Sequence, residues 1–207
     1  FCSAGSFNVG RMNEEIIAAL ENALDEYDAG NHLFITRAKA ALAEKLVGIA
    51  PPGLNHVMLT SGGGEANDNA IKMARGTTGR PGVIALAKAY HGHTGFALSA
   101  IGKPVFRDPF EPLMPEFKHI PLNDISAADR AADDKTAAII LEPVMGEAGI
   151  FPAETEYIKG LRRICDERGI ILIFDEVQTG FGRTGKMFCC EHFGVSPDIM
   201  TVAKSLS

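Results

Sequence analysis

Cysteine, tryptophan and long apolar runs are scarce in this sequence, and each scarcity excludes a class of protein. The 207 residues include four cysteines and no tryptophan. Cys189 and Cys190 are adjacent, and neighbouring cysteines rarely pair in a disulfide framework, so we expect a reducing, cytoplasmic setting. No apolar stretch approaches the roughly 18 residues that span a bilayer, so we expect no membrane segment.

Positive charge is scarce as well. The chain has 20 Lys and Arg against 26 Asp and Glu, a formal net charge of -6. No run of basic residues supplies the positive patch of a nucleic-acid-binding protein, so nucleic acid is not expected as a partner. With 46% hydrophobic and 22% charged residues, the chain can form a sizeable core in one domain, with or without an appendage.

Both ends of the chain indicate a fragment of a larger protein. The chain opens at Phe1 without Met or a secretory leader, and it stops at Ser207, three residues after a lysine that follows an apolar run. We divide it into an N-terminal segment of arm and helices, residues 1–50, and a domain over residues 51–207.

The N-terminal segment is predicted to contain two helices. Residues 1–10 form a short strand or an extended arm, and after Asn13 a helix continues to near Gly30. Its apolar face consists of Ile16, Ile17, Leu20, Ala23 and Leu24. A second helix over residues 35–49 is stopped by Pro51. The residues that it is expected to bury are Ala38, Leu42, Leu46 and Ile49.

Strands and helices alternate through the rest of the chain, which predicts an α/β fold with a mainly parallel sheet. The predicted strands are residues 56–60, 83–87, 137–141, 170–174 and 199–203. The predicted helices start near Gly64, span residues 152–168 with Tyr157, Leu161 and Ile164 inward, and span residues 188–193. The proline-rich residues 102–123 are predicted to form a long surface loop near the site.

A polar or glycine-rich group follows each predicted strand, at the edge where such sheets bind ligands. Gly62–Gly64 could hold an anion on backbone N–H groups, although an ordinary tight turn explains these glycines equally well. Tyr90 offers a ring-stacking platform, or it caps the core beside solvated histidines. Glu142 and Asp175 end two strands with carboxylates, and Lys204 follows the last strand.

Lys204 carries the strongest chemical signal. A lysine at the end of a buried strand is partly desolvated, which is unfavourable unless the amine spends its time as an imine. A planar, phosphorylated, nitrogen-containing aldehyde would use the whole set: glycine N–H groups for the phosphate, an aromatic for stacking, a carboxylate for the ring nitrogen and an amine for the aldehyde.

Two other chemistries fit less well. Residues 180–186 have the spacing of a phosphate-binding loop, which makes a nucleotide hydrolase the remote alternative, but Met187 stands where magnesium needs Ser or Thr. Cys189, Cys190 and His192 match no zinc pattern with a second ligand pair, so no metal site is expected.

Five blocks of sequence, in order, resemble the class III family of pyridoxal-phosphate-dependent aminotransferases of fold type I. They are SGGGEAND at 61–68 with AIKMAR following, AYHGHT at 89–94, EPVMGEAG at 142–149, FDEVQTGFGRTG at 174–185 and PDIMTVAKSL at 197–206. The resemblance runs from end to end. It implies a three-layer large domain that binds pyridoxal 5'-phosphate over residues 51–207, a missing C-terminal part of the family fold, and a homodimer with the cofactor at its interface.

The resemblance also assigns roles. Lys204 would be the Schiff-base lysine and the acid/base of the reaction, and Asp175 would pair with the pyridinium nitrogen, as an anion there favours the protonated ring. Gln178 would bind the ring hydroxyl, and Val177 would pack on the ring opposite Tyr90. The remaining cofactor contacts would be Gly62, Gly63 and Gly64 at the phosphate, His91 beside Tyr90, and Glu142. Glu142 and Glu147 fall on family positions near the cofactor and the substrate.

The implied function is a transaminase that moves an amino group from an amine or amino acid to an oxo acid in a ping-pong cycle. A decarboxylase or aminomutase of the same family, or an inactive fragment, would share these motifs. Three departures leave the substrate open: His93 stands where relatives acting on ornithine or acetylornithine often have arginine, Gly64 replaces a hydroxyl residue, and residues 10–13 read GRMN where GHxHP is common.

Overall fold

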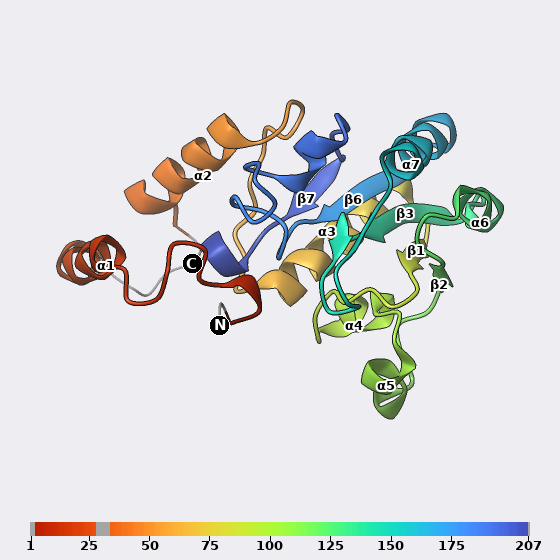
Figure 1. Ribbon diagram of the computed structural model, residues 1–207, viewed down its shortest axis with the longest axis horizontal. Coiled ribbons are helices and arrows are strands. Elements are labelled where there is room, and N and C mark those ends of the chain that lie inside the picture. Colours follow the sequence, from red (N-terminus) through yellow and green to blue (C-terminus); the bar gives the residue numbers. More distant parts are fainter. Residues whose placement is uncertain (1–2, 28–33, 207) are drawn as a thin grey trace.

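A five-stranded parallel sheet forms the centre of the computed structural model, which describes residues 3–27 and 34–206 (Figure 1). The strand order is β2-β1-β3-β6-β7, with every neighbouring pair parallel. The strands are β1 (Gly82–Leu86), β2 (Phe117–Ile120), β3 (Thr136–Leu141), β6 (Ile171–Asp175) and β7 (Ile199–Thr201). The expectation of a mainly parallel sheet is therefore confirmed.

The central strands are apolar because helices cover both faces of the sheet. Every residue of β1 and β3 is buried, as is β6 from its second residue onward. Helices α3 (Gly63–Thr78) and α4 (Gly95–Ala100) pack on one face, and α6 (Ile125–Ala131) and α7 (Thr155–Arg168) pack on the other. The fold thus has three layers, as expected.

Helix α7 was predicted to begin at residue 152, but it begins at Thr155. Pro152 instead belongs to a small antiparallel hairpin, β4 (Val144–Met145) with β5 (Phe151–Pro152). The predicted inward residues Tyr157, Leu161 and Ile164 are buried, and Gly169 ends the helix in the left-handed conformation that glycine adopts without strain.

The N-terminal helices are present, but their apolar faces are not buried as predicted. Helix α1 (Glu14–Glu26) is capped by Asn13, yet its Leu20 and Leu24 side chains are 62% and 78% exposed. The predicted end near Gly30 lies outside the described residues. In α2 (Arg37–Ile49) only Leu46 is buried, while Ala38 and Leu42 are exposed and Ile49 is half-buried against the core.

Two local predictions are wrong, and one of two alternatives is excluded. Residues 56–60 form no strand, because they pair with no neighbour, and Met58 and Leu59 are exposed. The segment 102–123 is not a plain loop, since it contains α5 (Pro104–Arg107), the 3-10 helix η2 (Asp108–Phe110) and strand β2. Residues 3–10 contain no strand and begin with the 3-10 helix η1 (Ser3–Gly5), while residues 1–2 lie outside the described part.

Candidate active site

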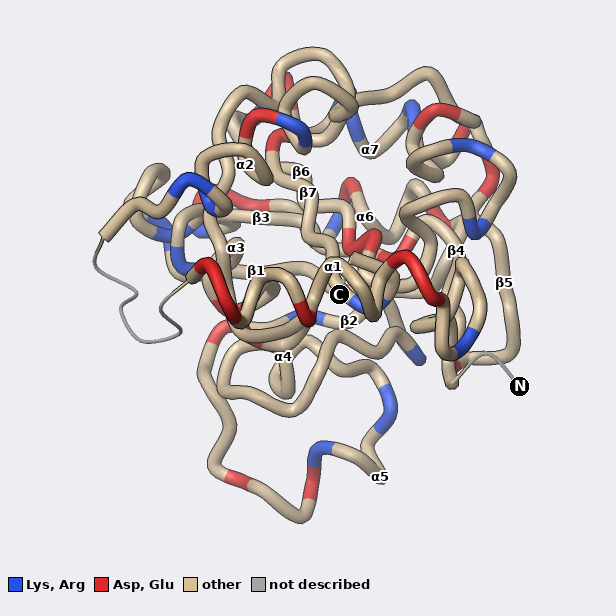
Figure 2. The backbone as a smooth tube through the Cα atoms, turned by 90° about the vertical axis from the view of Figure 1, so that its left-hand side faces the viewer, with Lys and Arg blue, Asp and Glu red and all other residues tan. Residues whose placement is uncertain are grey.

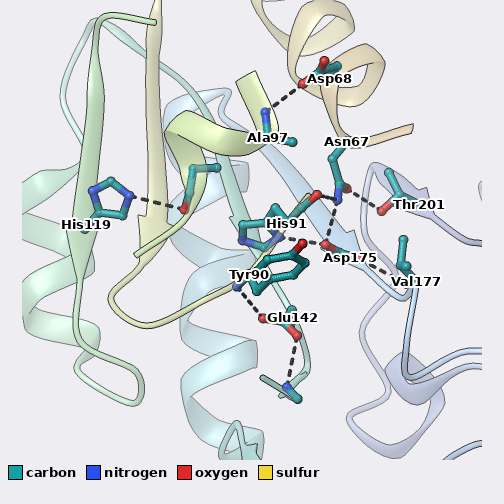
Figure 3. A network of polar contacts seen from close by, with 12 residues as sticks. Asn67, Asp68, Tyr90, His91, Ala97, His119, Glu142, Asp175, Val177 and Thr201 are labelled. Atoms are coloured by element: carbon teal, nitrogen blue, oxygen red, sulfur yellow. Dashed lines mark hydrogen bonds and ion pairs between the residues drawn. The ribbon is translucent and has the colours of Figure 1, made fainter. Parts of the chain in front are cut away.

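The carboxyl ends of the parallel strands bring five of the predicted site residues together, namely Tyr90, His91, Glu142, Asp175 and Val177 (Figure 3). Tyr90 follows β1, Glu142 follows β3 and Asp175 is the last residue of β6. The Tyr90 N–H donates to Glu142 Oε1 over 2.9 Å, and His91 Nδ1 lies 2.7 Å from Asp175 Oδ2. The loops after three neighbouring strands therefore form one polar cluster.

Asp175 is the centre of this cluster. Its side chain is 4% exposed and accepts hydrogen bonds from His91 Nδ1 and, over 2.8 Å, from Asn67 Nδ2, both at Oδ2. The backbone N–H of Val177 donates to Oδ1 over 3.0 Å. Three donors provide the partners that a buried, ionised carboxylate requires. Oδ1 accepts a single hydrogen bond among these and keeps capacity for another donor.

Asn67 and Thr201 complete the cluster, and sequence reasoning assigned neither a role. The Thr201 hydroxyl donates to Asn67 Oδ1 over 2.7 Å, and Asn67 Nδ2 also donates to the His91 carbonyl over 2.8 Å. One sequence signal was available, because Asn67 shares the helical spacing of the buried stripe Ala70, Ile71 and Ala74. An amide in an apolar stripe needs polar partners in the core.

Glu142 braces the backbone around Tyr90. Its Oε2 accepts from the Gly146 N–H over 3.1 Å, while its Oε1 holds the Tyr90 N–H. Burial raises the pKa of Glu142 above its ordinary value. The Tyr90 hydroxyl lies 2.6 Å from His93 Nε2, and burial together with the Glu147 carboxylate raises the pKa of Tyr90.

Two glycines of the turn, Gly63 and Gly64, are packed so closely that an added Cβ would be crowded, whereas Gly62 faces open space. A Cβ on Gly63 would lie 2.9 Å from Val177 Cγ1, and one on Gly64 would lie 3.1 Å from the Thr94 hydroxyl. Gly92, with a φ of 119°, approaches the turn from the other side, so that its Cβ would lie 2.6 Å from Gly64 Cα. Gly62 is the N-cap of α3, and no side chain caps this helix. The helix N-terminus thus presents backbone N–H groups beside Val177.

Gln178 lies at the border of the cluster, against the N-terminal arm. Its Nε2 donates to the Ala4 carbonyl over 2.8 Å, and its Oε1 occupies the place of a Cβ on Gly146. The Ser205 hydroxyl donates to the Gly5 carbonyl over 2.8 Å. The first described residues therefore cover the loops after β6 and β7, and the segment around Gly5 lies beside Ser205 (Figure 1).

Lys204 opens the short 3-10 helix η4 (Lys204–Leu206), three residues beyond β7. Its backbone φ is 48°, a left-handed value that is uncommon outside glycine and costs on the order of 1–3 kcal/mol. Within residues 3–27 and 34–206, no hydrogen bond or ion pair engages its ammonium group. The amine is half-buried and available for chemistry.

Glu176 is a second buried carboxylate, which the sequence presented only as half of an acidic pair. It accepts from the backbone N–H groups of Cys189 and Cys190, over 2.7 and 2.8 Å, and from the Thr179 hydroxyl. Burial raises the pKa of Glu176. Its contacts close the loop after β6 and fix the 3-10 helix η3 (Cys189–His192), which differs from the α-helix that follows a phosphate-binding loop.

A metal site, a membrane-spanning helix or a charged patch would indicate another class of ligand in the described part of the chain. It contains no group of three His, Cys, Asp or Glu side chains that could hold a metal ion. None of its helices combines the length and apolar character needed to cross a membrane. Basic and acidic residues are interspersed along the backbone (Figure 2). A cavity of about 630 Å³ beside Pro51 and Val195 is lined by none of the predicted site residues.

Comparison with known proteins gives consistent matches over the full chain. A family model described as Aminotransferase class-III matches residues 1–207. An uncharacterized aminotransferase of Archaeoglobus fulgidus is 48% identical over 206 residues, which are 100% of this chain and 48% of that protein. The acetylornithine aminotransferase of Methanocaldococcus jannaschii is 44% identical over 98% of this chain and 52% of its own length.

Solved structures agree with the sequence matches. A transaminase from a marine Virgibacillus has a TM-score of 0.91 and 34% sequence identity, with 99% of this chain and 50% of that chain covered. The chain thus spans about half the length of the proteins that it matches.

Proposed function

This chain belongs to the class-III aminotransferase family, and on that premise we propose that it carries the pyridoxal-phosphate half of a transaminase site. The substrates are an amino donor, either an amine or an amino acid, and an oxo-acid acceptor. The observation that carries the proposal is the buried Asp175, with spare acceptor capacity on Oδ1, at the end of β6. The neighbouring strand β7 pairs Thr201 with Asp175 and leads three residues later to Lys204, and the N-terminus of α3 beside them has no side-chain cap.

The residues present fit pyridoxal phosphate. The turn Gly62–Gly64 presents backbone N–H groups without side chains of its own at the start of α3, while the nearby Glu65 carboxylate is engaged by the Ser61 N–H and hydroxyl; such a turn suits a dianionic phosphate. Asp175 suits a protonated ring nitrogen, and Val177 with Tyr90 supplies an apolar and an aromatic surface for a planar ring. Gln178 would hold the ring hydroxyl, with His91 and Glu142 as supports around the ring.

Bound at this site, pyridoxal phosphate supplies an electron sink for the carbanion that forms when the donor loses its Cα proton. Asp175 holds a proton on the ring nitrogen, since an ionised carboxylate there favours the cationic ring. His91 and Val177 fix the carboxylate in place through Oδ2 and Oδ1. Lys204 Nζ would hold the aldehyde group of the cofactor and, when free, would take and return the proton at the donor carbon.

The donor side of the site carries less positive charge than an arginine would provide. His93, bonded to the Tyr90 hydroxyl, stands at the position where a guanidinium would bind a carboxylate. We therefore propose that no guanidinium at this position binds a donor carboxylate, which favours amines without a carboxylate there over ornithine-like amino acids. A decarboxylase or an aminomutase would use the same cofactor residues and is distinguished by its products.

The proposal extends to the organisation of the protein. Helices α1 and α2 lie outside the sheet layers (Figure 1), which supports the division into a segment of residues 1–50 and a cofactor-binding domain of residues 51–207. The exposed apolar residues of α1 support a homodimer. The free, buried thiols Cys165, Cys189 and Cys190 support a reducing, cytoplasmic location.

A half-reaction of the full-length protein tests the proposal. The protein is loaded with pyridoxal phosphate and given an amine donor without any oxo acid. A transaminase releases up to one equivalent of oxo product per site and stops, and turnover resumes when an oxo acid is added. Carbon dioxide release would favour the decarboxylase, an isomerised amine the mutase, and no donor consumption with any donor class would refute the proposal.

A further inference from the structure

Asn67 lies where three parts of the proposed cofactor site meet. We infer that Asn67 is a positioning residue whose side-chain amide sets the glycine turn, Asp175 and the strand that leads to Lys204 in one fixed arrangement. The inference rests on the proposed function, and it concerns a residue that touches neither cofactor nor substrate in that proposal.

The amide of Asn67 has every main hydrogen-bonding group engaged inside the protein. The residue is 1% exposed, and its two N–H groups go to Asp175 Oδ2 and the His91 carbonyl, each over 2.8 Å. Its Oδ1 accepts from the Thr201 hydroxyl over 2.7 Å. These partners come from β6, the loop after β1, and β7, so one side chain of α3 contacts three separate segments (Figure 3).

The orientation of the amide is determined by its neighbours. A carbonyl and a carboxylate only accept hydrogen bonds, so the amide nitrogen must face His91 and Asp175. Rotating the amide by 180° would direct its oxygen at both of these acceptors. The Thr201 hydroxyl can donate or accept, so it fits the orientation that His91 and Asp175 impose, and in that orientation it donates to Asn67 Oδ1. Thr201 therefore belongs to the hydrogen-bond network that positions the Asn67 amide.

Asn67 is connected to the glycine turn, to Asp175 and to the strand that precedes Lys204. Asn67 is on the first turns of α3, whose first residues are the glycines proposed to hold the phosphate. Thr201 is the direct register partner of Asp175 in the parallel β6–β7 pair, and its carbonyl accepts from the Glu176 N–H over 2.9 Å. Lys204 follows three residues later. Loss of the amide would remove the hydrogen bonds that tie α3 to the Asp175 carboxylate and to β7, while β6 and β7 would stay paired with each other.

Core packing alone does not explain an asparagine here. The stripe to which Asn67 belongs continues as Ala70, Ile71 and Ala74, all fully buried. An apolar residue at position 67 would satisfy that stripe without the cost of burying an amide. Asp175 would then lose a donor, while His91 and Val177 would still hold it. The expected effect is a weakened site and not an abolished one.

The test separates binding from folding in the full-length protein. The dissociation constant for pyridoxal phosphate is measured by equilibrium dialysis, and the melting temperature is measured on the cofactor-free protein. Asn67→Ala and Thr201→Val should each weaken binding about tenfold or more, as expected for a lost hydrogen bond to a charged group or its support. Thr201→Ser retains the hydroxyl and should bind within about twofold of wild type.

Two controls make the result specific. Ile71→Val removes one buried methylene from the same helix and should lower the melting temperature without changing the dissociation constant. In the double variant, Thr201→Val should add little to Asn67→Ala, because both act through the same amide. If Asn67→Ala fails to fold, the Thr201→Val and Thr201→Ser pair still decides the matter.

The outcomes are distinguishable. Variants that melt lower but bind pyridoxal phosphate like wild type would show that Asn67 is merely structural, and would overturn the inference. Equal losses in Thr201→Val and Thr201→Ser would overturn it as well. Wild-type protein that does not bind pyridoxal phosphate at all would refute the proposed function itself, and the inference with it.

Discussion

Replacing Gly92 with alanine should weaken the binding of pyridoxal phosphate far more than it weakens the fold. Gly92 has a φ of 119°, where an L-residue is strained by about 1–3 kcal/mol, and its Cβ would lie 2.6 Å from Gly64 Cα. Ordinary contacts begin several tenths of an ångström farther away, so one of the two backbones must shift. Both border the turn proposed to hold the phosphate, and a shift there misplaces its N–H donors.

The magnitude follows from the strain. If about 1.4–3 kcal/mol is expressed at the turn, the dissociation constant for pyridoxal phosphate rises about 10- to 150-fold. Equilibrium dialysis of the Gly92→Ala protein measures this rise, and thermal melting of the cofactor-free protein measures the effect on folding. The assay needs no substrate, so it is independent of the identity of the amino donor.

Gly53 provides the matched control. Its φ is 98°, and nothing lies within 4 Å of its added Cβ, so Gly53→Ala carries backbone strain without any contact at the site. It should lower the melting temperature and leave the dissociation constant within about twofold of wild type. Wild-type affinity in Gly92→Ala, or an equal loss of affinity in Gly53→Ala, would refute the reasoning.

Three further predictions concern stability. Gly102→Ala should fold poorly, since its Cβ would overlap the fixed backbone of Lys88; a wild-type melting temperature would contradict this. Glu176→Gln should lower the free energy of unfolding, measured with denaturant, by about 1–3 kcal/mol, because the glutamine NH2 group would face the buried N–H of either Cys189 or Cys190 and leave that donor without an acceptor. An unchanged free energy of unfolding would contradict the assigned contacts. Burial lowers the pKa of His119 below 6.5, so the unfolded chain binds the proton more tightly than the folded protein does. The free energy of unfolding should therefore fall as the pH drops below 6.5. His119→Gln should reduce this pH dependence, and an equal pH dependence in both proteins would disprove the prediction.

The strands that could be predicted are those whose own sequence indicates burial, without knowledge of which strand lies beside them. Val83–Leu86 and Ala137–Leu141 are short apolar runs between turn residues, and such runs are buried wherever the sheet places them. Strand β2 was missed because Phe117–Ile120 is only four residues long, has Lys118 and His119 at its centre, and lies at a sheet edge after a run of prolines. Residues 56–60 have strand-like composition but no neighbouring strand, and composition alone cannot supply one.

The apolar face of α1 shows the same limit. Its periodicity correctly predicted a helix, because spacing is a local property. Whether Leu20 and Leu24 are covered depends on what packs against them, and within the described residues nothing covers them. Periodicity therefore predicted the element and not its burial.

The site residues that could be predicted are those that directly follow a predicted strand. Asp175 and Tyr90 were expected at one edge from topology alone, and the structure places them there. The supporting contacts were not predictable, since the Gln178–Ala4 hydrogen bond joins residues 174 positions apart. Asn67 was passed over because asparagine in a helix is usually read as a solvated residue, although its spacing places it inward.

Chemical trapping of the cofactor on the protein tests the central claim most directly. The full-length protein is incubated with pyridoxal phosphate, reduced with borohydride, digested and analysed by peptide mass spectrometry. The account predicts one stable pyridoxyl-phosphate adduct, on Lys204. The yield of this adduct should fall in Asp175→Ala and when the cofactor is removed before the borohydride is added. An adduct confined to other lysines, such as Lys88, Lys103 or Lys186, or no adduct at all, would contradict it.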